Sequence, residues 1–399
     1  MTNSFLKFLF FILVPFICNA QSDFSSKEAK IDSLMKAHII HTGKSPVHSF
    51  LLYANNEKTG LKIDKGFGII GRSETEIDAD YQFNCASITK TFVATIILQL
   101  EEEGKLALSD KAYKYLQPID FVKADKIHIL KDTNYSKEIT IEQLLNHTSG
   151  IADIFTDAQT RFNISVLLHK KRQFNTEMIM ERYYRYHLNK KPFNRPGEGY
   201  HYSDMNYMFL GFIIENITDK TLPEAIRERI LEKAGMKNTY FEYYEPAITE
   251  GKRIDAFLGK INMTKRINTS YEWGGGGLVT TTKDLALFIQ LLFDKKLFKH
   301  PETLKKMTDT DKVKKFNANY GYGLFSFEVN GILYYGHGGF YGSLLLYEPV
   351  ERITFSANIS QATPPYNTEK LVVELLNDIS ANVSNRLSTS FFKSSVVIP

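Results

Sequence analysis

Residues 84–90 read NCASITK and lead directly into an apolar pattern with the 3.6-residue period of a helix. The residues that carry this period are Phe92, Val93, Ile96, Ile97 and Leu100, and Gly104 follows where a helix is expected to end. Ser87 and Lys90 are three residues apart, so on a helix their side chains share one face. A partly desolvated lysine loses some of its preference for the charged form, and its neutral amine can then take the proton of a serine hydroxyl.

The spacing alone is weak support, because the same S-x-x-K spacing also begins at Ser4, Ser33 and Ser390. The alternative is that Ser87 merely starts a helix and that Lys90 is exposed. Position favours a catalytic pair. Ser87 opens an apolar helix, so we expect its hydroxyl at the helix N-terminus, facing the junction of two lobes, where free N–H groups favour negative charge.

The rest of the chain places extended segments at both ends of a helical middle. Residues 28–40 have helical periodicity, and residues 49–54 and 61–70 follow as the two strands of a hairpin. From about residue 87 to 300 the pattern is mostly helical, with a capping box expected at Thr281 and Asp284. The later extended runs are residues 324–329, 332–335, 343–347 and 353–357, and a helical stretch follows at 369–379.

This arrangement predicts an α+β fold, in which one sheet is built from N- and C-terminal segments and an all-helical lobe is inserted between them. The expected catalytic domain spans residues 21–385. Its sheet lobe covers about residues 28–75 and 270–385, and its helical lobe covers about residues 80–265.

Residues 1–20 read as a cleaved secretory signal, because Lys7 precedes the apolar run 8–18 and small residues follow. The run is shorter than the roughly 20 residues of a membrane-spanning helix, so we expect no transmembrane anchor after cleavage. The protein is therefore expected to be exported, to the periplasm or beyond. Cys85 would then be the only cysteine, a buried structural thiol, and the apolar tail 386–399 has no assigned role.

Composition argues against one class of partner. The 399 residues include 49 Lys and Arg against 45 Asp and Glu, for a formal charge of +4. That excess is too small for phosphate neutralisation along a nucleic acid to be a source of binding energy. We expect a small-molecule or peptide partner instead.

Two further segments carry candidate chemistry. Residues 196–204 read PGEGYHYSD and lead into a helical run, and a tyrosine there, Tyr202, can shuttle protons if nearby amines lower its pKa. Its alternative is an ordinary core aromatic. Residues 336–340 read GHGGF beside the late strands, where glycines allow close approach to a ligand and a strand edge can pair with an extended substrate. The alternative there is a plain turn.

The order of these motifs resembles the serine β-lactamase and penicillin-binding protein superfamily, in particular its class C-like branch of D,D-peptidases, D-aminopeptidases and esterases. Two flanking segments agree with it, ITIEQLLNHTSGI at 139–151 and GGGLV at 275–279 with Asp284 beyond. The resemblance runs from about residue 30 to 380. It implies a β-lactamase/transpeptidase-like fold with an antiparallel sheet.

The resemblance also implies roles for individual residues. Ser87 is the nucleophile, while Lys90 and Tyr202 move its proton. The N–H groups of Ser87 and Phe340 hold the oxyanion. The substrate-binding strand comprises His337, Gly338 and Gly339, with Asp204 on the facing segment.

Two of these positions depart from the family pattern. Asp204 stands where class C enzymes have asparagine, and His337 stands where many members have a lysine, so its charge is expected to vary near neutral pH. These changes favour a peptidase or an esterase over a β-lactamase. We place a D,D-carboxypeptidase or D-stereospecific peptidase ahead of an esterase. A catalytically silent ligand sensor on the same fold is the alternative from another class.

No cofactor or metal is expected. The sequence contains no zinc motif, phosphate loop or Gly-x-Ser-x-Gly elbow, and His38 and His41 have helical spacing without further ligands.

Overall fold

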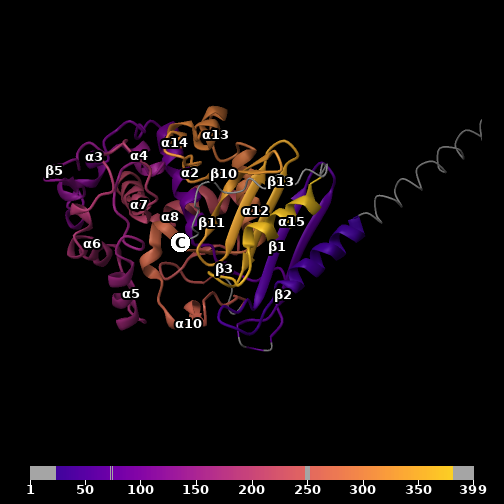
Figure 1. Cartoon of the computed structure of the whole chain (residues 1–399). Helices are drawn as coiled ribbons and strands as arrows, with labels where there is room; N and C mark the ends of the chain where they lie inside the picture. The colour runs from indigo at the N-terminus through magenta and orange to yellow at the C-terminus, as the bar shows by residue number, and fades with distance from the viewer. Residues whose placement is uncertain (1–23, 72, 74, 248–251, 381–399) are drawn as a thin grey trace, which may run out of the picture.

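The computed structural model describes residues 24–71, 73, 75–247 and 252–380, so the predicted signal peptide and the apolar tail lie outside the described residues. Its main element is a six-stranded antiparallel sheet with the order β10-β11-β12-β13-β1-β2 (Figure 1). The strands are β1 (Ser49–Asn56), β2 (Leu61–Gly68), β10 (Phe325–Val329), β11 (Ile332–Gly339), β12 (Ser343–Glu348) and β13 (Ile353–Ile359). Strands from the two ends of the chain meet where β1 pairs with β13, which confirms the predicted sheet.

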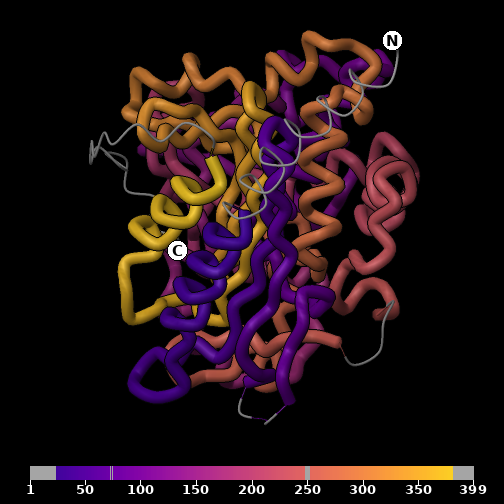
Figure 2. Tube along the Cα trace, turned by 90° about the vertical axis from the view of Figure 1, so that its right-hand side faces the viewer, coloured from indigo at the N-terminus to yellow at the C-terminus, as the bar shows by residue number. Residues whose placement is uncertain are grey.

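Successive side chains along the strands point to opposite faces of this sheet, and both faces carry apolar residues. Leu51 packs into the core shared with the helical lobe, whereas its neighbour Leu52 packs into a second core on the other face. The second core is closed by the N-terminal helix of residues 24–37 and by α15 (Thr368–Ile379), which lie side by side over the strands in Figure 2. On the first face, α12 (Thr282–Phe293) packs against β1, β12 and β13.

A group of helices forms the other half of the molecule, on the left in Figure 1. The longer ones are α2 (Thr89–Glu102), α5 (Gln159–Leu168), α6 (Thr176–Arg185) and α7 (Asp204–Thr218). The shorter ones are α3 (Tyr113–Leu116), α4 (Ile141–Leu145), α8 (Leu222–Ile226), α9 (Glu232–Ala234), α10 (Met263–Arg266), α11 (Trp273–Gly276), α13 (Pro301–Thr308) and α14 (Asp311–Lys314). Helices α2 and α7 pack together in the middle of this half and are apolar on nearly all sides. They therefore form a rigid support for residues at their N-termini.

A small sheet connects the two halves. It has the order β3-β9-β6, with β3 (Phe83–Asn84), β9 (Leu278–Thr280) and β6 (Tyr240–Phe241). Strand β3 delivers the chain directly to the start of α2. The predicted capping box after β9 is only half formed, because Thr281 accepts from the Asp284 N–H while the Asp284 carboxylate binds Asn238 and Thr239 instead.

Two short hairpins complete the described chain, β4 (Ile129–Leu130) with β5 (Thr133–Asn134) and β7 (Phe257–Leu258) with β8 (Ile261–Asn262). Within the described ranges, no helix combines the length and the apolar character needed to cross a bilayer.

Candidate active site

Ser87 lies in a single turn of 3₁₀-helix, Ala86–Ile88, between β3 and α2. Ala86 adopts a left-handed backbone conformation, with φ of 46°, so the chain turns sharply before the serine. Strand β11 contacts this turn closely. A Cβ on Gly339 would lie 2.2 Å from the Cys85 carbonyl oxygen, so only glycine fits at this position. Ser343 donates a 2.8 Å hydrogen bond to the same carbonyl. Strand β11 therefore lies directly against the turn that carries the nucleophile.

Ser87 and Lys90 are in contact, as their spacing predicts. Lys90 Nζ lies 2.9 Å from Ser87 Oγ, and Ser87 keeps 9% of its surface exposed while Lys90 is fully buried. The ammonium also donates to Asp204 Oδ1 at 2.5 Å and to the Gly275 carbonyl at 2.8 Å. Three acceptors around one nitrogen match the three N–H bonds of a charged lysine. Asp204 is the negatively charged member of this buried set of acceptors.

Tyr202 completes the predicted trio. Its ring centroid lies 5.0 Å from Lys90 Nζ, and its hydroxyl hydrogen-bonds Ser87. The expected lowering of its pKa is wrong. Burial and the Asp204 charge raise the pKa of Tyr202 well above its ordinary value, and the hydrogen bond to Ser87 only partly opposes them. Tyr202 is thus a neutral phenol at rest, ready to donate a proton.

Asp204 begins α7 and is held by a second, buried carboxylate. Its backbone N–H donates to Asp153 Oδ2 at 2.6 Å. Asp153 is completely buried and also accepts from the backbone N–H groups of Phe155 and Thr156. Burial and the nearby Asp204 charge raise the pKa of Asp153 to about 7. Sequence reasoning did not identify Asp153, because nothing in its local pattern distinguishes it from the other acids.

His337 lies on β11, and both of its ring nitrogens have hydrogen-bond partners within the protein. Its Nδ1 lies 2.6 Å from the Gly338 carbonyl oxygen, and its Nε2 lies 3.2 Å from the Tyr320 hydroxyl. Burial, reinforced by the Lys90 charge, lowers the pKa of His337 to about 3. The expectation that its charge varies near neutral pH is therefore wrong, and His337 is a neutral imidazole there.

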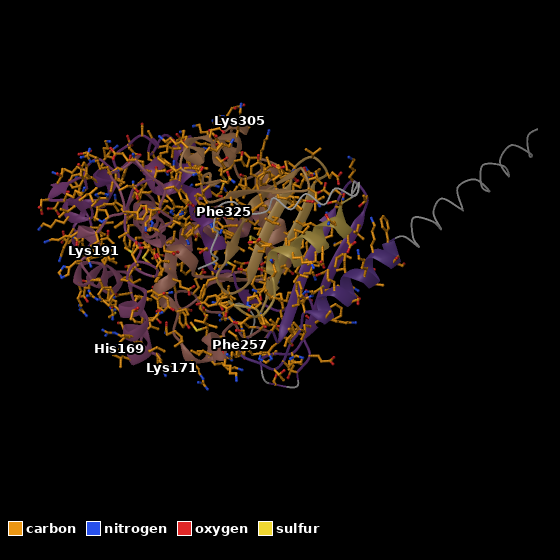
Figure 3. The ribbon with its side chains drawn as sticks, viewed as in Figure 1. His169, Lys171, Lys191, Phe257, Lys305 and Phe325 are labelled. Atoms are coloured by element: carbon orange, nitrogen blue, oxygen red, sulfur yellow. The ribbon has the colours of Figure 1, made fainter. Side chains whose placement is uncertain are left out.

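An aromatic cluster fixes the position of Tyr202. Its ring stacks on Phe325, with centroids 6.3 Å apart, and Figure 3 labels Phe325 on the side of the sheet that faces the helical half. The buried His147 ring lies 4.3 Å from Tyr202, and its Nδ1 accepts from Ser203 N–H and the Asn206 amide. The motif around residues 139–151 therefore supports the phenol from beneath.

Phe340 follows β11 directly and is partly exposed. In the part of the chain that is described, no acceptor is recorded for its N–H group. The N–H of Ser87 lies in the first turn before α2, where helical N–H groups have no intrahelical partner. Both predicted oxyanion donors are thus placed on the two segments that meet at Gly339 and Cys85.

A further acid near the nucleophile, Glu272, was not predicted. It ends the short helix Ser270–Glu272, and its Oε1 accepts a short hydrogen bond from the Tyr341 hydroxyl. Burial raises its pKa to about 8, and the charges of Glu242 and Asp204 act in the same direction. Its only sequence signal was its place before the glycine run 274–277.

The remaining candidates do not join this site. Cys85 is buried, and burial raises the pKa of its thiol to about 12, as expected of a structural cysteine. Among the described residues no cluster of three potential metal ligands occurs. An apolar cavity of about 350 Å³ lies on the opposite side of the sheet, under α15, and Ser87, Lys90 and Tyr202 do not line it.

The comparisons with known proteins agree with this geometry. The family model for Beta-lactamase matches residues 34–376, most of the chain. The chain belongs to the Beta-lactamase family. Membership confirms the resemblance drawn from the motifs and places the chain among β-lactamase-related hydrolases.

Curated relatives of this family member match at modest identity. A protein named flp from Staphylococcus aureus (strain N315) is 26% identical over 372 residues, 88% of this chain and 67% of that protein. The flp protein of strain MW2 is 29% identical over 222 residues, and the match spans only 39% of its length. A putative D-alanyl-D-alanine carboxypeptidase from Escherichia coli (strain K12) is 28% identical over 323 residues, 68% of this chain and 67% of that protein.

Solved structures show the same fold. A D-stereospecific amidohydrolase from Streptomyces sp. superposes with a TM-score of 0.70 at 23% identity, covering 86% of this chain and 97% of that one. A D-amino acid amidase from Ochrobactrum anthropi SV3, complexed with L-phenylalanine, superposes with a TM-score of 0.72 at 19% identity, covering 88% and 98%. At these identities the likeness establishes the fold, and the predicted architecture is confirmed.

Proposed function

We propose that this protein is an exported serine hydrolase that cleaves an amide through an acyl-enzyme on Ser87, with a D-configured residue on the acyl side. One observation carries the proposal: Lys90 Nζ lies 2.9 Å from Ser87 Oγ, and Tyr202 hydrogen-bonds the same hydroxyl. The names of relatives that act on D-amino acid derivatives support the stereochemical part. Residues 1–20 support export.

The residues present suffice for acyl transfer. Lys90 gives up one proton to solvent to become an amine, and this amine takes the Ser87 proton as Oγ attacks the carbonyl carbon. The N–H groups of Ser87 and Phe340 hold the resulting oxyanion. When the C–N bond breaks, Tyr202 protonates the leaving nitrogen and is reprotonated from Lys90. Water then attacks the Ser87 ester, which releases the acid and restores the hydroxyl.

A silent ligand sensor is the second candidate. A sensor would tolerate displacement of Lys90 or Tyr202 from Ser87, whereas here both contact its hydroxyl. The contacts therefore favour an enzyme. Among enzymes, a histidine at position 337, where many members of the family have a lysine, favours a peptidase or amidase over a β-lactamase.

The test combines labelling with a substrate panel. A fluorophosphonate should add one phosphonyl group to the Ser87 peptide, and Ser87→Ala should abolish the adduct. The panel contains D-amino acid amides, D-Ala-D-Ala peptides, p-nitrophenyl esters and nitrocefin, and we expect turnover of the D-amides. Labelling of Ser87 without turnover of any substrate would support the sensor, and no labelling would reject the mechanism.

A further inference from the structure

We infer that Glu272 binds a free amino group of the substrate next to the scissile carbonyl, so that the enzyme acts at the amino end of a peptide or on an amino acid amide. The inference rests on the proposed acyl transfer at Ser87 and names the substrate end that this site accepts.

The site offers no unpaired cation for a substrate carboxylate. Lys90 is the only lysine recorded against Ser87 in the described chain, and its charge is matched by Asp204 at 2.5 Å. His337 stands where a cation would be needed, but both of its ring nitrogens already have partners and it is neutral at neutral pH. A substrate carboxylate beside the scissile bond would therefore find no free counter-charge among these groups.

Glu272, in contrast, places a carboxylate beside the nucleophile. The point where a Cβ of Gly276 would lie is 3.0 Å from Glu272 Oε2 and 3.4 Å from the Cα of Ala86, the residue before Ser87. Because Gly276 has no Cβ, the carboxylate reaches this position. On its other side, Oε1 accepts from the hydroxyl of Tyr341, which follows the predicted oxyanion residue Phe340.

This carboxylate has no cationic partner of its own. No ion pair is recorded for Glu272 in the described chain, and no donor is recorded for its Oε2. Its acidic neighbour Glu242 is different, since Arg253 pairs with it at 2.6 Å. Ionising a partly buried carboxyl group is costly without a counter-charge, so Glu272 keeps its proton at neutral pH in the empty site. An ammonium bound at Oε2 would supply the counter-charge and let Glu272 ionise.

The surroundings suit the rest of an amino acid. Ala86, Ala256 and Tyr341 form a small apolar cluster, with the partly exposed side chains of Met263 and Phe340 packed against it. An acyl donor whose carbonyl faces Ser87 carries its α-substituents next to that carbonyl. One substituent can then contact the apolar cluster while the amino group contacts Glu272, and this division of the two substituents selects one configuration.

The protonation of Glu272 should make substrate affinity depend on pH. The groups that act on Glu272 are Tyr341, Glu242, Asp204 and Lys90, and its pKa of about 8 means that the empty site holds a proton at neutral pH. A cationic substrate binds the ionised form, so its affinity should rise as pH increases towards 8. It should fall again when the substrate amine itself loses its proton, at a pKa of roughly 8.

The experiment compares substrates that differ only in the amine: D-alanyl p-nitroanilide and propionyl p-nitroanilide. The wild-type enzyme should prefer the D-alanyl compound. In Glu272→Gln, kcat/KM for that compound should fall by about 10- to 100-fold, the range of a charge-assisted hydrogen bond, while kcat/KM for the propionyl compound changes less than about twofold. The matched control is Glu369→Gln, which alters a glutamate in the first turn of α15 that lines the outer cavity, and it should leave both values unchanged.

A second measurement does not depend on the variant folding. Using the wild-type enzyme and p-nitrophenyl acetate as reporter, D-phenylalanine amide should inhibit competitively at least about tenfold more strongly than 3-phenylpropionamide, which lacks the amine. Equal inhibition, or equal losses of both anilides in Glu272→Gln, would overturn the inference. Failure of p-nitrophenyl acetate turnover and of Ser87 labelling would instead reject the proposed function itself.

Discussion

Replacing Asp204 with asparagine tests how the site holds the lysine that activates Ser87. The carboxylate lies 2.5 Å from Lys90 Nζ, and the lysine is fully buried. Asparagine keeps a carbonyl oxygen that can accept the same hydrogen bond but removes the negative charge. The variant therefore removes the carboxylate that is paired with Lys90 in the described chain.

The expected size follows from the burial of the pair. Removing one partner of a buried ion pair costs about 3–5 kcal/mol of unfolding free energy. We expect the lower end of this range, because asparagine still accepts the hydrogen bond and because loss of the Asp204 charge lets the buried Asp153 ionise more readily and partly replace it. The free energy of unfolding should therefore fall by about 3 kcal/mol.

The assay is urea unfolding at neutral pH, followed by circular dichroism. The control variant Glu369→Gln changes an acid in the first turn of α15, away from Ser87, and should unfold like the wild-type protein. A folded Asp204→Asn variant that is as stable as the wild-type protein would refute the reasoning, because Lys90 would then not depend on Asp204 for its counter-charge.

Three other substitutions give distinct expectations. Tyr202→Phe should reduce kcat/KM for amides by about 10²–10⁴-fold but affect p-nitrophenyl esters far less, because a nitrophenolate leaves without the proton that Tyr202 supplies; equal losses in a stopped-flow comparison would argue against its role as acid. The stability of His337→Gln should depend less on acid pH than that of the wild-type protein. Histidine in the unfolded chain binds a proton below about pH 6.5, whereas buried His337 binds one only near pH 3. The wild-type protein therefore loses stability as the pH falls from about 6.5 towards 3, and the variant lacks this loss. Urea unfolding at several pH values should show the stability difference between wild type and variant shrinking towards acid pH, and a constant difference would contradict burial as a neutral imidazole. Gly339→Ala should cost about 1–3 kcal/mol of unfolding free energy and most of the acylation rate, because its Cβ would lie 2.2 Å from the Cys85 carbonyl; a stable and active variant would show that β11 does not press on the nucleophile turn.

Much of the architecture follows from local patterns. The hairpin of residues 49–70 and the helix after Ser87 could be predicted because each has its own apolar period, of two and of 3.6 residues, and recognisable ends. The meeting of Ser87, Lys90 and Tyr202 was predicted from motif order through a family resemblance. Nothing in the spacing of residues 90 and 202 alone brings them together.

The protonation and charge pairing of the site residues could not be predicted in the same way. Protonation depends on burial and on charges brought close by folding, and neither is a local property of the sequence. Lys90 is paired with Asp204, which lies 114 positions away in the sequence. Tyr202 was expected to have a lowered pKa and His337 a charge that varies near neutral pH, but both are enclosed by the same aromatic cluster. Glu272 was missed because the position of its carboxylate depends on Gly276 and Tyr341, and only the fold places these two residues beside it.

The central claim is that Ser87 attacks a carbonyl whose oxygen is then held by the N–H groups of Ser87 and Phe340. The most direct measurement is a crystal structure of the enzyme after reaction with a fluorophosphonate, whose phosphorus mimics the tetrahedral carbon. The account predicts a covalent bond from Ser87 Oγ to phosphorus, with the phosphoryl oxygen within hydrogen-bond distance of both N–H groups and Lys90 still beside Oγ. Phosphorus on another residue, or a phosphoryl oxygen turned away from Phe340, would contradict it.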